Sequence, residues 1–184
     1  CGVVGGESGG AGARGGGVVV GGTGKGWCGK ALGRRWREPG REAITANTVF
    51  DLASLGKGVA TAPAMMILYE QGKFRLNDPV SRYLPEFKGD GKDEITIRQL
   101  MTHYSGFGPD LALEPYWEGK AEAERRLWAG KAVAPTGAGR LYSDINFEKL
   151  GLLVERLTGL TLGGFARKTL PRPLGQEHPV FTSH

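Results

Sequence analysis

The sequence has few of the residues that build disulfide frameworks or metal sites. Its 184 residues include only two cysteines, Cys1 and Cys28, and three histidines, His103, His178 and His184. The cysteine spacing matches no zinc, redox or haem-attachment motif, and the histidines form no cluster of metal ligands along the chain. We therefore expect neither a metal nor a cofactor.

Long hydrophobic runs are also missing. The longest weakly polar stretch, residues 59–69, contains Pro63 and is far shorter than the ~20 residues that span a membrane. We expect no transmembrane segment. The chain opens on a cysteine without a signal-peptide pattern, so we expect a mature product or a fragment.

The chain has the composition of a soluble protein, with more basic than acidic residues. Hydrophobic residues make up 40% and charged residues 23%, which is typical of a one-domain globular protein. The net charge is +5, and one basic cluster comprises Lys30, Arg34, Arg35, Arg37 and Arg41. Such a cluster can attract nucleic acid, but no reader motif accompanies it. We expect a solvated basic turn without a nucleic-acid partner, and keep a basic nucleic-acid-binding module as the least favoured alternative.

Glycine is unevenly distributed along the chain. Half of the 32 glycines lie in the first 40 residues. We expect a flexible glycine-rich arm over residues 1–16 and a hairpin over 17–33, which so much glycine makes entropically weak. A short extended stretch at 48–52 should lead into a helical region over 48–184.

That helical region shows start and stop signals along its length. Helices are expected at residues 54–71, 79–84, 96–105, 121–129 and 146–158, and loops at 107–120 and 130–141. Thr96 and Gln99 form the pattern of a capping box. The last helix should bury one apolar face, made of Leu150, Leu153, Val154 and Leu157.

The first of these helices has a less regular pattern. Val59, Ala62 and Met66 share one face at helical spacing. Pro63 should kink the helix near its first two turns, because proline removes a backbone donor.

Ser54 and Lys57 stand three residues apart at the start of that helix. Residues at i and i+3 share a helix face, so the hydroxyl and the amine can come within reach. A serine needs an adjacent base to become a nucleophile. A lysine can be that base if burial or a positive potential, such as that of a helix N-terminus, destabilises its ammonium. By spacing alone, a capping serine beside a solvated lysine explains the pair slightly better.

Four stretches, taken in order, are more informative than the pair. "TVFDLASLGKGVAT" closely resembles the Ser-x-x-Lys box of the serine β-lactamase superfamily, and "LYEQGKFRLNDPVSRYLPEF" is similar to the segment that follows it. "ITIRQLMTHYSGF" resembles the family's Thr-His-Thr-Ser-Gly stretch, and "PTGAGRLYSDINFEKLGLLVERLTG" resembles its second box, Tyr-Ser-Asn or Tyr-Ser-Asp opening a helix. The superfamily includes class C-type β-lactamases, penicillin-binding D-alanyl-D-alanine carboxypeptidases and β-lactamase-like esterases. The match covers residues 17–181.

The resemblance implies roles for four residues. Ser54 would be the acylated nucleophile and Lys57 its proton partner. Tyr142 would be the second proton-transfer group. Asp144 stands where the lactamases usually carry Asn, and it would orient Lys57 or the substrate. A carboxylate there favours an esterase or peptidase relative over a true β-lactamase.

Three further residues are His103, within "MTHYSG" of the third stretch, and Phe107 and Trp117, in the loop that follows it. Phe107 and Trp117 would either line an acyl pocket or pack their loop down, and we expect them among the substrate-binding residues. His103 is interpreted as structural, fixing the loop that enters the helical region.

Two departures from the family pattern stand out. Gly56 and Gly58 flank Lys57 where the family commonly has Thr and Val, and glycine loosens a helical turn. The third box, Lys-Thr-Gly or His-x-Gly, has no match before His184. We expect the serine β-lactamase-like α/β plus α fold, an antiparallel sheet flanked by helices with a helical region. Residues 17–184 would form a partial domain, truncated before the C-terminal sheet strands.

The resemblance implies a serine hydrolase that forms an acyl-enzyme on an ester, a β-lactam or a D-Ala-D-Ala-type amide. The partner would be a small-molecule or peptide substrate. The alternative is a non-catalytic or inactive member that binds cell-wall peptides. The periplasm or cell envelope is the expected location, with the cytoplasm open for esterase members.

Overall fold

The chain divides into two units, residues 1–52 and 53–184, which are described separately. The computed structural model describes residues 15–22, 25–36, 42–45, 48, 52–112 and 114–169. Most of the predicted arm, together with the C-terminal fifteen positions 170–184, lies outside these residues.

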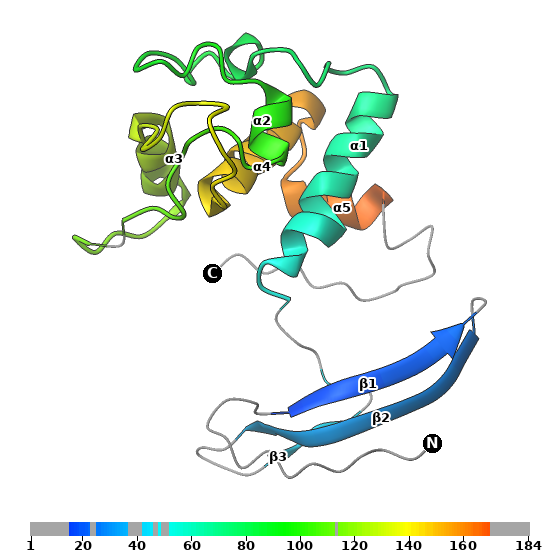
Figure 1. Cartoon of the computed structure of the whole chain (residues 1–184). Helices are drawn as coiled ribbons and strands as arrows, with labels where there is room; N and C mark the ends of the chain where they lie inside the picture. The colour runs from blue at the N-terminus through cyan, green and yellow to red at the C-terminus, as the bar shows by residue number, and fades with distance from the viewer. Residues whose placement is uncertain are drawn as a thin grey trace. The chain divides into compact units, whose positions relative to one another are not determined.

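The first unit carries a three-stranded antiparallel sheet, β1-β2-β3 in spatial order (Figure 1). Its strands are β1 (Gly15–Gly22), β2 (Lys25–Trp36) and β3 (Glu42–Ala43). The β1–β2 hairpin is present but longer than the predicted 17–33, because backbone pairing continues through the glycines at both ends of the register. The sequence did not indicate β3, and of the extended stretch at 48–52 only positions 48 and 52 are described.

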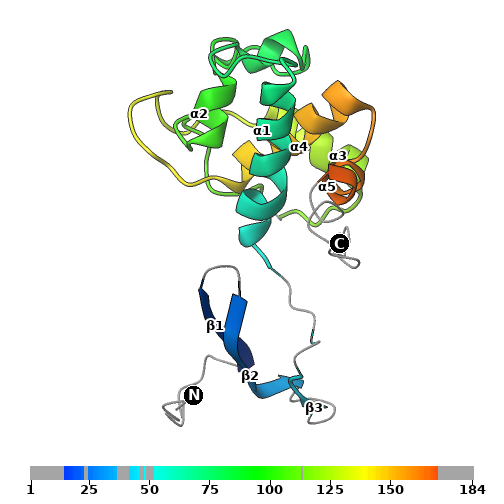
Figure 2. The same ribbon diagram turned by 90° about the vertical axis from the view of Figure 1, so that its right-hand side faces the viewer.

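The second unit is helical. Its elements are η1 (Lys57–Thr61), α1 (Ala62–Glu70), η2 (Val80–Arg82), α2 (Ile97–Met101), α3 (Lys120–Ala129), α4 (Asp144–Thr158) and α5 (Leu162–Thr169). Helix α4 is the centre of this unit, since it contacts η1, α1, α2, α3 and α5. Figure 2 shows α1 and α4 side by side. The core of this unit contains seventeen buried apolar residues, including Leu68, Phe87 and Leu153.

The helix predicted at 54–71 is present, but its first part is a π-helical turn. The Ala62 amide donates to the Lys57 carbonyl five residues back, rather than four. Pro63 follows at once, and its ring would clash with the carbonyl of Val59 in a regular α-helix. A π turn widens the backbone here, and such turns are frequent at functional sites.

The face predicted for this helix is wrong. Val59 is 54% exposed and Met66 43% exposed, whereas Ala64, Met65 and Leu68 are buried. The buried face is therefore made of Ala60, Thr61, Ala64, Met65 and Leu68, a different face of the helix from the one that hydrophobic spacing indicated.

The other helices are closer to expectation. The capping box at Thr96 and Gln99 is present in both directions, although α2 ends at Met101, earlier than predicted. Helix α3 agrees within one residue, and α4 begins at Asp144, two residues before the predicted start. Leu150, Leu153 and Val154 are fully buried, as predicted, and Leu157 is partly buried. Helix α5 was not predicted, because Gly163 and Gly164 weaken its helix propensity.

Candidate active site

Ser54 lies in the turn that leads into the first helix, with its side chain exposed. The residue before it, Ala53, has φ 43°, a left-handed conformation that alanine rarely adopts. Backbone strain of this kind costs about 1–3 kcal/mol and is concentrated at functional sites. The turn therefore presents Ser54 to solvent at the expense of local stability.

Lys57 is the centre of a small cluster of polar side chains. Its Nζ donates to Ser54 Oγ at 3.2 Å and forms an ion pair with Asp144 Oδ1 at 2.8 Å. The same atom lies 5.1 Å from the centre of the Tyr142 ring. The structure thus brings together, from two helix N-termini, the four residues that the two sequence boxes singled out.

The charge of Lys57 is not destabilised, contrary to the sequence-based expectation. Burial lowers the pKa of Lys57, but the side chains of Asp144 and Tyr142 outweigh it and raise the pKa above the usual lysine value. The Lys57 side chain is 16% exposed and the Asp144 side chain 39% exposed, so the ion pair lies at the surface and is only partly screened by water. At neutral pH the group beside Ser54 is an ammonium ion.

The position of Tyr142 is set by His103. The His103 carbonyl accepts a hydrogen bond from the Leu141 amide at 2.8 Å, and its Nδ1 accepts one from the Ser143 amide at 3.1 Å. The imidazole ring lies 4.7 Å from the Tyr142 ring. The acceptor role of Nδ1 places the proton of the neutral ring on Nε2. His103 is buried, and burial, followed by the charges of Arg140 and Lys57, lowers its pKa.

A second set of contacts fixes the loop that carries His103. Ser105 Oγ donates to Asn146 Oδ1 at 2.6 Å, inside the core. Gly106 has φ 84°, and a Cβ there would lie 2.1 Å from the carbonyl oxygen of Ala134. The structural interpretation of His103 and its neighbours is therefore supported by a rigid, glycine-dependent loop beside the start of α4.

The ring and hydrogen-bond contacts of Phe107 and Trp117 are with residues other than Ser54 and Lys57. Phe107 is fully buried in the core, where its ring packs edge-on against Phe87 at 5.9 Å. Trp117 donates its indole N–H to the Ala112 carbonyl at 2.9 Å and stacks under Arg126. Phe107 packs into the core and Trp117 against its own loop, and their expected role in substrate binding stays a prediction.

Sequence reasoning missed two buried lysines, Lys149 and Lys92, near the C-terminus of α3. Lys149 is fully buried among three aromatic rings and donates to the Leu127 carbonyl. Lys92 donates to the Trp128 carbonyl at 2.7 Å. Both satisfy carbonyls at the C-terminus of α3, where cations are favoured. Burial, and then the charge of Lys92, lower the pKa of Lys149 to about 7.

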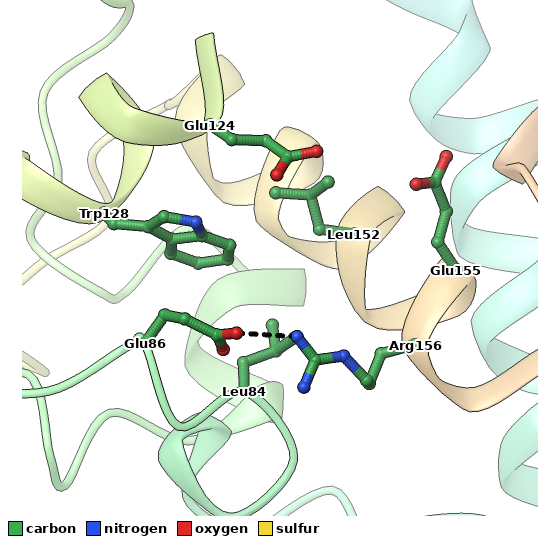
Figure 3. A pocket seen from close by; sticks show the side chains of 7 residues that line it. All are labelled: Leu84, Glu86, Glu124, Trp128, Leu152, Glu155 and Arg156. Carbon is green, nitrogen blue, oxygen red and sulfur yellow. Dashed lines mark hydrogen bonds and ion pairs between the residues drawn. The ribbon is translucent and has the colours of Figure 1, made fainter. Parts of the chain in front are cut away.

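A shallow hollow on the helical unit does not include the cluster. It lies between α3, α4 and the turn at 84–86, and Figure 3 shows Trp128 as one wall with the Glu86–Arg156 ion pair opposite. Arg156 Nη2 lies 2.7 Å from Glu86 Oε1. Within the described part of the chain, no group of three or more His, Cys, Asp or Glu side chains is arranged to hold a metal ion.

Comparison with known proteins identifies the family. The sequence profile of the Beta-lactamase family matches residues 5–184, and the chain belongs to this family, within the serine β-lactamase-related superfamily. A curated relative from Salmonella agona, named "Putative D-alanyl-D-alanine carboxypeptidase", is 34% identical over 154 residues. The alignment covers 74% of this chain and 35% of that protein, so the chain spans about a third of the relative's length.

Solved structures agree on the fold. A class C β-lactamase matches with a TM-score of 0.72 at 28% identity, covering 88% of this chain and 44% of that one. FmtA from Staphylococcus aureus matches with a TM-score of 0.73 at 28% identity, covering 83% and 42%. The fold is therefore class C β-lactamase-like, as the four sequence stretches predicted. None of the helices in the described ranges is long and apolar enough to cross a membrane.

Proposed function

We propose that this chain carries the nucleophile half of a serine hydrolase that works by acyl transfer on an ester, a β-lactam or a D-Ala-D-Ala-type amide. The observation that supports it most is the Lys57 Nζ position, 3.2 Å from Ser54 Oγ and 2.8 Å from Asp144 Oδ1. A hydroxyl, a cation and a second proton-transfer group, Tyr142, converge at one solvent-exposed point. Acyl transfer to a serine needs the hydroxyl and an adjacent base, and the phenolate form of Tyr142 or the neutral form of Lys57 would supply that base.

In the proposed reaction, Ser54 Oγ attacks the carbonyl carbon of the substrate. The hydroxyl proton passes to the phenolate form of Tyr142 or to the neutral form of Lys57, and the oxyanion is stabilised near the positive end of the first helix. The proton then moves to the leaving group as the carbonyl-to-leaving-group bond breaks. Water adds to the acyl-serine and releases the acid, regenerating Ser54.

Asp144 gives this mechanism a definite pH dependence. Because Asp144 and Tyr142 raise the pKa of Lys57, the lysine is charged in the resting state and cannot accept the Ser54 proton. The neutral lysine is a minor species at pH 7, and its share grows with pH. If Lys57 is the base, acylation accelerates as pH rises above neutrality.

The relatives guide the proposed substrate and location. The curated relative is named as a carboxypeptidase of D-alanyl-D-alanine, and a solved neighbour as a class C β-lactamase. We place the working partner among small-molecule or peptide acyl donors, and the working compartment in the periplasm or cell envelope. Membrane and periplasmic fractionation of a host cell that expresses the chain tests the location.

Turnover of chromogenic substrates tests the function. A p-nitrophenyl acetate assay and a chromogenic cephalosporin assay are run on the native chain, on Ser54→Ala and on the matched control Ser81→Ala, whose hydroxyl donates to the Asp93 carbonyl far along the chain from the cluster. We expect nitrophenol release that is lost in Ser54→Ala and kept in Ser81→Ala. Equal rates in all three proteins would contradict the proposal.

A non-catalytic member of the family is the second candidate, and the charged state of Lys57 favours it. An ammonium that donates to Ser54 Oγ stabilises the resting hydroxyl and offers no base. Such a chain would bind a cell-wall peptide without turnover. Saturable binding of a D-Ala-D-Ala peptide by calorimetry, with no product after long incubation, would identify this case.

A further inference from the structure

One residue of the candidate site, His103, contacts the backbone on both sides of Tyr142. The Leu141 amide donates to the His103 carbonyl at 2.8 Å, and the Ser143 amide donates to His103 Nδ1 at 3.1 Å. His103 is itself attached to α2, because its own amide donates to the Leu100 carbonyl at 3.3 Å. The backbone that carries the Tyr142 phenol is therefore tied to another helix through a single residue.

A second buried donor faces the same ring nitrogen. Ser105 Oγ accepts a hydrogen bond from the Phe107 amide at 3.2 Å and donates one to Asn146 Oδ1 at 2.6 Å. Because Asn146 Oδ1 is the acceptor of that bond, the Asn146 amino group faces His103 Nδ1, at 3.5 Å. Ser105, Ser143 and Asn146 are fully buried. Both groups that meet Nδ1 here are N–H donors, so this nitrogen serves them only as an acceptor.

These contacts require one protonation state of the ring. An acceptor at Nδ1 means a neutral imidazole with its proton on Nε2, and a second proton would set an N–H group against two others. Burial, followed by the positive charges of Arg140 in the loop before α4 and Lys57 on η1, lowers the pKa of His103. Asp144, at the start of α4, opposes this shift. The Tyr142 ring packs against the imidazole at 4.7 Å, so the surroundings favour a neutral ring in contact with the phenol.

We propose that His103 is a positioning residue for acylation, which keeps the Tyr142 phenol beside Lys57 only while its ring is neutral and protonated on Nε2. This inference rests on the proposed acylation of Ser54 and describes how that site is regulated. Protonation of Nδ1 replaces the acceptor of the Ser143 amide by a donor, so the backbone at Tyr142 is released as the pH falls. His103 takes no proton from the substrate in this scheme and acts on the reaction through Tyr142.

Nuclear magnetic resonance of the native chain tests the protonation state without any reaction. Long-range proton–nitrogen spectra distinguish the two neutral tautomers of an imidazole from its charged form, and His103→Asn identifies the signals of His103. We expect a neutral ring protonated on Nε2 at neutral pH, which titrates below about pH 6.5. The Ser143 amide resonance should move with that titration. A proton on Nδ1 at neutral pH, a Ser143 amide that does not follow the ring, or a ring that stays neutral until the chain unfolds overturns the inference.

Acylation by an activated ester is then compared in a matched pair of variants. His103 has φ 64°, which glycine and asparagine tolerate better than most residues. His103→Gly removes the ring and keeps the backbone carbonyl, whereas His103→Asn supplies Oδ1 as an acceptor that does not titrate. We expect acylation to be about 10²-fold slower in His103→Gly, because small misplacements of catalytic groups cost that much. His103→Asn should recover most of this loss.

Tyr142→Phe separates positioning of the phenol from a general structural role. If His103 acts through the phenol, His103→Gly should cost little further rate in a Tyr142→Phe chain, because changes that remove one shared interaction are not additive. The same fold-loss in both backgrounds, equal losses in the two His103 variants, or a native rate in His103→Gly overturns the positioning role and leaves acyl transfer standing. A native chain whose Ser54 is not acylated overturns the proposed function, and with it the role of His103 in acylation.

Discussion

The ion pair between Lys57 and Asp144 reverses the direction in which the sequence predicted the pKa of Lys57 to shift. The spacing of Ser54 and Lys57 indicated a lysine whose charge is destabilised by a helix N-terminus, but a carboxylate 2.8 Å away raises its pKa instead. The sequence placed Asp144 in the second box and named it as a residue that orients Lys57. The sign of its electrostatic effect required the distance between two helices, which no local pattern contains.

Asp144→Asn should move the pH profile of acylation toward neutrality. The change removes the carboxylate that raises the pKa of Lys57, so more of the lysine is neutral at a given pH. Each unit by which the pKa falls increases the neutral lysine, and the rate if Lys57 is the base, about tenfold below the pKa. Stopped-flow acylation by an activated ester from pH 6 to 10 measures the shift.

Asp90→Asn is the matched control for this experiment, because Asp90 pairs with Lys131 at 3.3 Å and lies outside the cluster. Its profile should coincide with that of the native chain. A profile that is also unmoved in Asp144→Asn would show that Lys57 does not supply the rate-limiting deprotonation.

At the scale of single elements, the sequence predicted those helix ends that depend on interactions between residues close together in the chain. Thr96 and Gln99 determine the start of α2 through two hydrogen bonds within four residues, and Gly159, with φ 71°, ends α4. The π turn at Lys57–Thr61 was not predictable in the same way. It depends on how Pro63 is accommodated while Ala60 and Ala64 pack into the unit, and that is determined by tertiary packing rather than by local sequence.

Gly58→Ala should stabilise the protein by up to about 1 kcal/mol, because alanine loses less conformational entropy than glycine in a helical turn. A Cβ at Gly58 would meet no heavy atom within 4 Å, and its φ is not positive. Urea unfolding followed by far-ultraviolet circular dichroism measures the change.

Gly106→Ala serves as the opposite control. There the new Cβ would lie 2.1 Å from the Ala134 carbonyl oxygen at a positive φ, so a loss of about 1–3 kcal/mol is expected. If Gly58→Ala lowered the unfolding midpoint as Gly106→Ala is expected to do, the helical conformation described for the turn at Gly58 would be wrong.

At the scale of the whole molecule, the order of four stretches was enough to predict the fold, because each stretch belongs to a different part of the helical unit. The core was less accessible from sequence. Lys149 reads as a polar residue on the face of α4, yet it is buried beside Phe107 and Trp128. The carbonyl that receives it, that of Leu127, belongs to α3, 22 residues earlier, so only the assembled unit explains its position.

Stability should rise between pH 7 and pH 10 because of Lys149. Its pKa is about 7 in the folded chain and about 10.4 when unfolded, so the unfolded state binds more protons in this window. The unfolding free energy therefore increases as pH rises. Lys57 and Lys120 have raised pKa values and act only at higher pH.

Urea unfolding at pH 7, 8, 9 and 10 measures this slope, with Lys149→Met as the comparison. The methionine variant should lose most of the slope, since it removes the group that titrates while keeping the side-chain volume. A slope that persists unchanged in Lys149→Met would assign it to another group.

The most direct measurement is the intact mass of the chain after exposure to a β-lactam and, separately, to an activated short-chain ester, followed by peptide mapping. The proposed mechanism predicts one acyl adduct, located on the peptide that contains Ser54 and absent from Ser54→Ala. An unmodified mass in a chain shown to be folded by circular dichroism, or an adduct on any other residue, would contradict the assignment of Ser54 as the nucleophile.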